Sequence, residues 1–158
     1  MTGKCWHTEY ADFVRCDGCG LWRQNPQPPS IDVLARYDDA YLAYETSRHM
    51  EYRSIALMRL AEAGLHPDRK IGDARMLEIG CATGALLSVF AEAGWNTTGV
   101  EVGSSLAAYA RTHFGLDVRT GTLDQASLRY GSFDVIMALH LVEHLNEPVA
   151  FLAQLRKL

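Results

Sequence analysis

One stretch of the chain combines an apolar strand, a glycine turn and the start of a helix. Residues 76–84 read Met-Leu-Glu-Ile-Gly-Cys-Ala-Thr-Gly, and apolar residues at helical spacing follow from Ala85. A second apolar run ends in Glu101, 21 positions beyond Gly80. Small residues in such a turn let backbone N–H groups approach a ligand closely, and a carboxylate at the next strand end can bind ribose hydroxyls. The stretch therefore predicts a site for a nucleoside-containing cofactor.

Predicted strands and helices alternate regularly after residue 73. We expect strands at 75–79, 96–101, 116–120 and 133–139, a helical turn at 123–128, and helices at 85–93, 104–114 and 147–158. Asn146 is the expected cap of the last helix, and Pro148 lies in its first turn. This order is typical of an α/β protein with a doubly wound parallel sheet and right-handed crossovers. No strand follows the last helix, so we expect an incomplete domain with an open sheet edge that favours self-association.

Two segments precede this alternation. Residues 1–30 are rich in cysteine, aromatic residues and turn formers, and they end in a proline-rich run that cannot be helix interior. From there to about Gly64 the apolar spacing is helical, with Ser30 or Asp32 as the expected cap. We therefore expect a Cys-rich leader over 1–30, helical lid or linker segments over 31–73, and a cofactor-binding domain over 74–158.

Composition and charge exclude several classes of partner. The chain is 48% hydrophobic and 22% charged, as globular proteins are, and its formal net charge of −4 is the opposite of a nucleic-acid-binding surface. No apolar run is long enough to cross a bilayer, and the N-terminus lacks the apolar core of a secretory signal. We expect a cytoplasmic protein with a small-molecule substrate, no nucleic-acid or membrane partner, and reduced cysteines.

The glycine turn departs from the dinucleotide fingerprint, because Ala82 and Ala85 occupy two of its three glycine positions. The pattern Glu-x-Gly-x-x-x-Gly at 78–84 instead resembles the first motif of class I S-adenosylmethionine-dependent methyltransferases of type 11/23. Residues 97–102, 121–124 and 132–145 resemble later motifs of the same family. The resemblance implies a Rossmann-like fold with S-adenosylmethionine as the cofactor. Taken alone, the turn also suits an ordinary strand-to-helix connection with glycines at tight backbone angles.

The resemblance also implies roles for individual residues. Glu101 would bind both ribose hydroxyls, and Glu78 would lie near the cationic ammonium end of the cofactor. Cys81 belongs to the turn and is most simply a small packing residue. The other implied cofactor-binding residues lie after the four strands: Gly80, Cys81, Ala82, Thr83, Gly84, Val102, Gly121, Thr122, Leu123, Ala138, Leu139 and His140.

The segment from His140 to His144 has more than one interpretation. Two histidines flanking Glu143 match a zinc-hydrolase arrangement, but that arrangement needs a later ligand and only 14 residues follow. The family resemblance instead places Glu143 and His144 near the substrate mouth. His144 is then the candidate catalytic residue, accepting a proton from a hydroxyl acceptor. A purely structural role, in which His144 orients the loop through backbone hydrogen bonds, stays open.

The leader contains a candidate metal site. Cys16-Asp17-Gly18-Cys19-Gly20 has the form of a zinc knuckle, and Cys5 and His7 are the nearby candidates for two further ligands. Through Pro28 the segment resembles the zinc-ribbon leader that precedes some methyltransferase domains. The first Cys-x-x-Cys of that leader is absent here, so zinc at Cys5, His7, Cys16 and Cys19 is one of two interpretations. A degenerate knuckle with free thiols is the alternative.

Together these features predict a methyltransferase that uses S-adenosylmethionine and acts on an unidentified small-molecule acceptor. The alternative is a non-catalytic S-adenosylmethionine-binding module or a zinc-ribbon interaction module, because the predicted domain is incomplete. Tyrosines recur in the segment before the domain, where we expect them to pack a helical lid on the sheet. In the sharper interpretation, Tyr41 or Tyr44 lines the methionine end of the cofactor.

Overall fold

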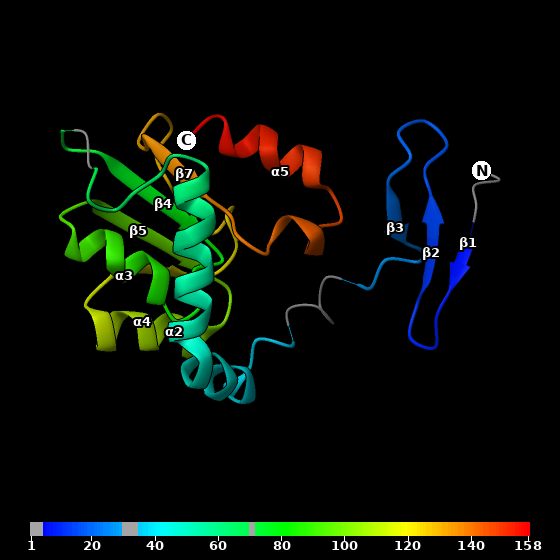
Figure 1. The fold of residues 1–158 in the computed structure, drawn as a ribbon, viewed down its shortest axis with the longest axis horizontal. Coiled ribbons are helices and arrows are strands. Elements are labelled where there is room, and N and C mark those ends of the chain that lie inside the picture. The colour runs from blue at the N-terminus through cyan, green and yellow to red at the C-terminus, as the bar shows by residue number, and fades with distance from the viewer. Residues whose placement is uncertain (1–4, 30–34, 70–71) are drawn as a thin grey trace. The chain divides into compact units, whose positions relative to one another are not determined.

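The computed structural model describes residues 5–29, 35–69 and 72–158 (Figure 1). The chain forms two compact units, residues 1–33 and residues 34–158. Within the described ranges, no helix is both long enough and apolar enough to cross a membrane.

The first unit is a small antiparallel sheet. Its strands β1 (Cys5–His7), β2 (Asp12–Arg15) and β3 (Trp22–Gln24) pair in the order β1-β2-β3. Thr8 closes the first turn, since its hydroxyl donates to the Ala11 carbonyl oxygen at 2.7 Å. The second turn follows β2 and is closed by Cys16, whose backbone N–H donates to Leu21 O at 2.8 Å.

The second unit begins with a long helix, α2 (Asp39–Glu62). The side chain of Asp38 accepts a hydrogen bond from the backbone N–H of Tyr41 and so caps this helix. Helix α2 thus starts later than the sequence analysis expected. The predicted caps Ser30 and Asp32 lie outside the described residues.

The centre of the second unit is a four-stranded parallel sheet with strand order β6-β5-β4-β7. The strands are β4 (Arg75–Ile79), β5 (Asn96–Glu101), β6 (Asp117–Thr120) and β7 (Val135–Met137). Helix α3 (Ala85–Glu92) connects β4 to β5, and α4 (Ser104–Phe114) connects β5 to β6. The predicted α/β class with a parallel sheet is confirmed, and parallel register brings the carboxyl ends of adjacent strands to one edge.

An apolar core lies on each face of this sheet, as is usual for parallel sheets. Met76 of β4 packs on the face that α3, α4 and α2 cover, together with Phe90. Leu77, the next residue of β4, points to the opposite face, where Leu158 and the C-terminal helix α5 (Pro148–Leu155) pack. Figure 1 shows α2 lying against α3 and α4 on one side of the sheet. Strand β4 therefore supplies Met76 to one core and Leu77 and Ile79 to the other.

The C-terminal quarter differs in detail from the sequence expectation. Strand β7 is shorter than the predicted range 133–139, and His140, three residues after its end, has a positive φ. A 3₁₀ helix, η1 (Val142–His144), comes next. Helix α5 begins at Pro148 with Glu147 at its cap position, one residue later than the predicted Asn146 cap.

Candidate cofactor site

The glycine turn after β4 is held in an unusual backbone conformation. Gly80, Ala82 and Gly84 all have positive φ, at 72°, 47° and 75°. Gly80 N–H donates to Val100 O at 2.8 Å, and Gly84 N–H donates to Cys81 O at 2.8 Å. A Cβ built at Gly84 would lie 2.6 Å from Leu116 Cδ1, so glycine is required there for space as well as for φ. The turn is thus a tight, fixed link between β4 and α3.

The carboxylate of Glu101 faces this turn from the end of β5. Its Oε2 accepts from Ala82 N–H at 2.9 Å, and its Oε1 accepts from Gly103 N–H at 2.7 Å. The side chain is buried, and burial raises the pKa of Glu101, although the two backbone donors act in the opposite direction. Among the described residues, Glu101 forms no ion pair. The carboxylate therefore lies against the glycine turn, and its role toward a ribose stays a prediction.

Glu78 supplies a second buried carboxylate, on the adjacent strand. It pairs in register with Gly99 of β5 and is only 4% exposed. Its Oε2 has no hydrogen-bond partner among the described residues. Burial, and then the charge of Glu101, raise the pKa of Glu78 to about 8. An unpartnered buried carboxylate is costly, and a cationic or hydrogen-donating ligand would offset that cost. The unpartnered Oε2 of Glu78 is thus compatible with a cofactor that has a cationic end.

The start of α2 lies beside Glu101. A Cβ built at Gly103 would lie 3.1 Å from Tyr37 O and 3.2 Å from Glu101 Oε1. Tyr41 is half-buried and its hydroxyl donates to Glu45 Oε1 at 2.8 Å. Burial raises the pKa of Tyr41, with smaller contributions from Glu45 and Glu101. The rings of Tyr37 and Tyr41 lie against each other, with their centroids 5.2 Å apart.

Tyr44 is more exposed than Tyr41, and the centroids of the two rings lie 6.2 Å apart. It is 45% exposed, and its hydroxyl hydrogen-bonds that of Tyr52 at 2.6 Å. The guanidinium of Arg48 lies 5.8 Å from the ring centroid of Tyr44. Of the two tyrosines that the sequence analysis named for the cofactor, Tyr41 is the less exposed.

The remaining predicted cofactor residues follow the strand ends. Thr83 and Cys81 are buried. Cys81 packs in the core, where its Sγ lies 2.7 Å from the position that a Cβ at Gly99 would take. Gly121 N–H donates to Glu101 O at 2.8 Å, which brings the segment Gly121, Thr122 and Leu123 to the end of β5. Val102 directly follows Glu101, and Ala138, Leu139 and His140 directly follow β7. The structure thus places all of these residues in the turn or in loops after four neighbouring strands.

The segment after β7 reaches back to the glycine turn. The side chain of Leu141 lies 3.7–3.9 Å from the position of a Cβ at Gly80. His140 has a positive φ of 52°, and its exposed ring lies 3.7 Å from Glu143, between Nδ1 and Oε1. His144 is exposed in η1, and its backbone N–H donates to Leu141 O at 2.9 Å. The role of His144 as a base stays a prediction.

The four predicted zinc ligands are not assembled in the structure. Cys5 pairs with Val14 and His7 pairs with Asp12, so His7 lies at the end of the sheet away from the Cys16 turn. His7 Nδ1 instead hydrogen-bonds Asp12 Oδ1 at 2.8 Å. Cys16 and Cys19 share one turn, where backbone N–H groups of Cys19 and Gly18 lower the pKa of Cys16. Within the described ranges, no three His, Cys, Asp or Glu residues are placed to hold one metal ion.

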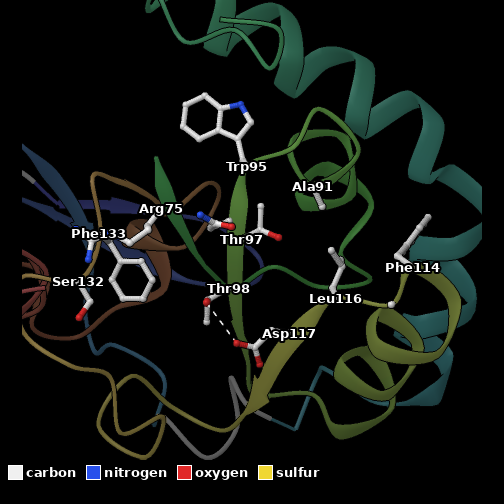
Figure 2. Close-up of a pocket in the computed structure, with 12 residues that line it drawn as sticks. Arg75, Ala91, Trp95, Thr97, Thr98, Phe114, Leu116, Asp117, Ser132 and Phe133 are labelled. Atoms are coloured by element: carbon white, nitrogen blue, oxygen red, sulfur yellow. Dashed lines mark hydrogen bonds between the residues drawn. The ribbon is translucent and has the colours of Figure 1, made fainter. Parts of the chain in front are cut away.

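A hollow of about 560 Å³ lies at the opposite edge of the sheet (Figure 2). Its lining includes Arg75, Asn96 and Asp117, which are the first residues of β4, β5 and β6. Arg75 is already paired with Asp134, and Thr98 Oγ1 donates to Asp117 Oδ2 at 3.4 Å. Because ligands of open α/β sheets bind at the carboxyl ends of strands, this hollow at the amino ends is separate from the predicted cofactor site.

Sequence reasoning missed three contributors to the site. Gly103 donates to Glu101, Tyr37 lies over Gly103, and Leu141 packs on the glycine turn. Gly103, two residues after Glu101, could have been recognised from the sequence, because a glycine there allows the backbone to approach the acid closely. The contacts of Tyr37 and Leu141 join segments far apart in sequence and have no local signature.

A family model described as a methyltransferase domain matches residues 77–158, which cover the glycine turn, Glu101 and the segment after β7. The chain belongs to this family. A ubiquinone biosynthesis O-methyltransferase from Rhodopseudomonas palustris is 33% identical over 85 residues, covering 51% of this chain and 33% of the relative. The chain thus spans about a third of the length of such curated relatives.

Solved structures agree with this family membership. A SAM-dependent methyltransferase from Archaeoglobus fulgidus is similar with a TM-score of 0.57 and 27% identity, covering 75% of this chain and 53% of that one. Magnesium protoporphyrin IX methyltransferase from Synechocystis, solved with bound SAM, has a TM-score of 0.52 and 20% identity, covering 68% of this chain and 52% of that one. The second likeness concerns the fold alone.

Proposed function

We propose that the unit of residues 34–158 binds S-adenosylmethionine and belongs to an enzyme that transfers its methyl group to a small-molecule acceptor. The observation that carries this proposal is the contact between Glu101 Oε2 and Ala82 N–H at 2.9 Å. It brings a strand-end carboxylate against the glycine turn of the neighbouring strand, at the edge where open α/β sheets bind ligands.

The residues of this chain would act mainly by binding and orientation. When bound, the cofactor supplies an activated methyl group on a good leaving group, so alignment can provide most of the rate acceleration. Glu101 would accept hydrogen bonds from the ribose hydroxyls. Glu78 would face the cationic amino-acid end, and residues Gly80 to Gly84 would allow the backbone to approach the ligand.

For the acceptor we propose a hydroxyl-bearing small molecule. Support comes from the O-methyltransferase names of the curated relatives, which align with the part of this chain that holds the site. A hydroxyl must lose its proton as the methyl group arrives. His144, after β7 and exposed, is the residue that we propose to accept that proton.

Calorimetric titration with S-adenosylhomocysteine tests the cofactor assignment. We expect wild-type protein to bind, and Glu101→Ala and Glu101→Gln to bind at least tenfold more weakly, because each removes the anionic acceptor pair. Glu92→Gln is the matched control, since Glu92 is exposed at the end of α3. Equal affinity of all four proteins would remove Glu101 from the site, and absence of binding to wild type would contradict the cofactor assignment.

A methyl-transfer assay separates the enzyme from the non-catalytic alternative. Radiolabelled methyl donor is offered with phenolic acceptors to this chain. Transfer of label to an acceptor by the wild-type protein, together with loss of this transfer in Glu101→Ala, supports catalysis. Cofactor binding without transfer to any acceptor would favour the binding-module alternative.

A further inference from the structure

Helix α2 exposes large side chains on the face opposite its contact with the core. Leu60, which is buried, packs with the core residues that α3 and α4 cover. On the other face, Tyr44, Ile55 and Met58 are 45%, 45% and 52% exposed. Five exposed residues of α2 form what we call the outer stripe: Tyr44, Arg48, Glu51, Ile55 and Met58.

The spacing of the outer stripe is that of a helix-pairing seam. Its members follow one another at intervals of four, three, four and three residues, so they lie on one face of the helix. The same alternation forms the contact line between paired helices. Tyrosine, methionine and arginine are also the residue types that are enriched at protein interfaces. The outer stripe therefore has both the periodicity and the composition of a contact surface for another helix.

The polar part of the outer stripe is already ordered within one chain. Arg48 donates from Nε and Nη2 to the Glu51 carboxylate at 2.8–3.0 Å. Its guanidinium also lies 5.8 Å from the ring centroid of Tyr44 and 5.3 Å from that of Tyr52. The two tyrosine hydroxyls are hydrogen-bonded to each other at 2.6 Å. Side chains that are fixed before association lose less conformational freedom when a partner binds.

The charges of the outer stripe complement those of an identical, antiparallel helix. Contacts across a two-fold axis are reciprocal, so Arg48 opposite Glu51 of a second copy also places Glu51 opposite the second Arg48. The same register sets Tyr44 opposite Ile55 on both sides of the axis. Its centre falls between His49 and Met50, close to the middle of α2, so nearly the whole helix overlaps. In a parallel pair in register, by contrast, Arg48 would face Arg48 and Glu51 would face Glu51.

We propose that α2 pairs with α2 of a second copy of this chain, antiparallel across a two-fold axis. Two arginines and two glutamates alternate at the centre, and Tyr44, Ile55 and Met58 pack on either side. The inference goes beyond the proposed function and does not depend on cofactor binding. A helix of 24 residues is about 36 Å long and about 10 Å wide, which gives a footprint of roughly 360 Å² per copy. This is smaller than a standard interface, so we expect a reversible dimer at micromolar concentrations.

Sedimentation velocity of the full chain over a range of concentrations tests the proposal with two charge reversals. Wild type should change from monomer to dimer as concentration rises. Arg48→Glu leaves only acids at the centre and Glu51→Arg leaves only arginines, so each should weaken the dimer at least tenfold. An equimolar mixture of these two variants should restore the dimer, because one copy then supplies the acids and the other the arginines. Arg129→Glu is the matched control, since it reverses an exposed charge outside α2.

Each outcome decides for or against pairing through α2. Wild type that stays monomeric up to several hundred micromolar overturns the proposal. A dimer that both reversals leave unchanged also overturns it, and places the interface elsewhere, for example at the open sheet edge of β7. A mixture that stays monomeric overturns the antiparallel register. Should circular dichroism show that a charge variant does not fold, Ile55→Ser decides: a weakened dimer supports the proposal, and an unchanged dimer overturns it.

Discussion

The carboxylate of Glu101 accepts a hydrogen bond from the backbone N–H of Ala82, which precedes it by 19 residues. The two residues belong to the ends of adjacent parallel strands, and Gly80 N–H donates to Val100 O within the same junction. The acid and the turn are therefore one local structure. Disturbing the backbone of the turn would displace the acid as well.

The crowding at Gly84 should make it the most sensitive glycine of the turn. In Gly84→Ala the new Cβ would lie 2.6 Å from Leu116 Cδ1 and 2.9 Å from Ala110 Cβ, at positive φ. We expect a loss of about 2–4 kcal/mol in the free energy of unfolding, from overpacking and backbone strain together. Gly115→Ala is the matched control, because Gly115 also has positive φ but has nothing within 4 Å of its Cβ position. Urea denaturation measures both, and equal losses would show that packing at Gly84 is unimportant.

The raised pKa of Glu78 should appear in the pH dependence of stability without any ligand. Burial raises its pKa to about 8 from an ordinary value of 4.5, so the folded chain binds the proton more tightly than the unfolded chain. The free energy of unfolding should therefore fall as pH rises from about 5 to 8, by up to about 1.4 kcal/mol per pH unit. Glu78→Gln should flatten this slope in denaturation experiments. A slope as steep in the variant as in wild type would contradict the assignment.

Asp134 should have the opposite dependence on pH. Hydrogen bonds from the Arg75 side chain and backbone lower the pKa of this carboxyl. Its contribution to stability is present above the unfolded-state pKa and is lost as acid protonates the folded-state carboxylate. Asp134→Asn should therefore lower the midpoint of urea denaturation at pH 7 and have less effect as pH falls below about 4. Asp68→Asn, at an exposed position, should show no such convergence with wild type.

The hydroxyl of Tyr41 should stabilise the start of α2. It donates to Glu45 Oε1 at 2.8 Å in a half-buried position. Tyr41→Phe removes this bond while keeping the ring, and we expect a cost of about 1–2 kcal/mol in thermal or urea denaturation. Tyr130→Phe is the control, because Tyr130 is 68% exposed. A cost of similar size in both variants would indicate that the bond to Glu45 contributes nothing.

The elements with strong local signals were predictable from sequence. Strands 75–79 and 96–101 and helix 104–114 have the predicted bounds, because an apolar run or apolar spacing ends at a turn former in each case. Strand β7 was predicted too long because an apolar run does not reveal where pairing stops. Its bounds depend on the pairing with β4, in which Met76 pairs with Val135, 59 positions away in the sequence.

For the candidate site, sequence placed the acids but not their environments. The positions of Glu78 and Glu101 followed from the predicted strand ends. Only the structure shows that, among the described residues, Glu78 Oε2 has no hydrogen-bond partner, whereas the Glu101 carboxylate accepts two backbone hydrogen bonds. The leader is the opposite case. Its cysteine spacing suggested a metal site, whereas strand register separates His7 from the Cys16 turn.

The burial of Cys81 gives the molecule a built-in reporter. Its thiol packs against Gly99 inside the core, although the residue belongs to the turn that a ligand would approach, and burial raises its pKa. An alkylating reagent should modify the exposed Cys5, Cys16 and Cys19 first and reach Cys81 only when the turn opens. The rate of Cys81 alkylation, followed by mass spectrometry, would then report how often the turn opens. Any ligand that keeps the turn closed would slow the alkylation.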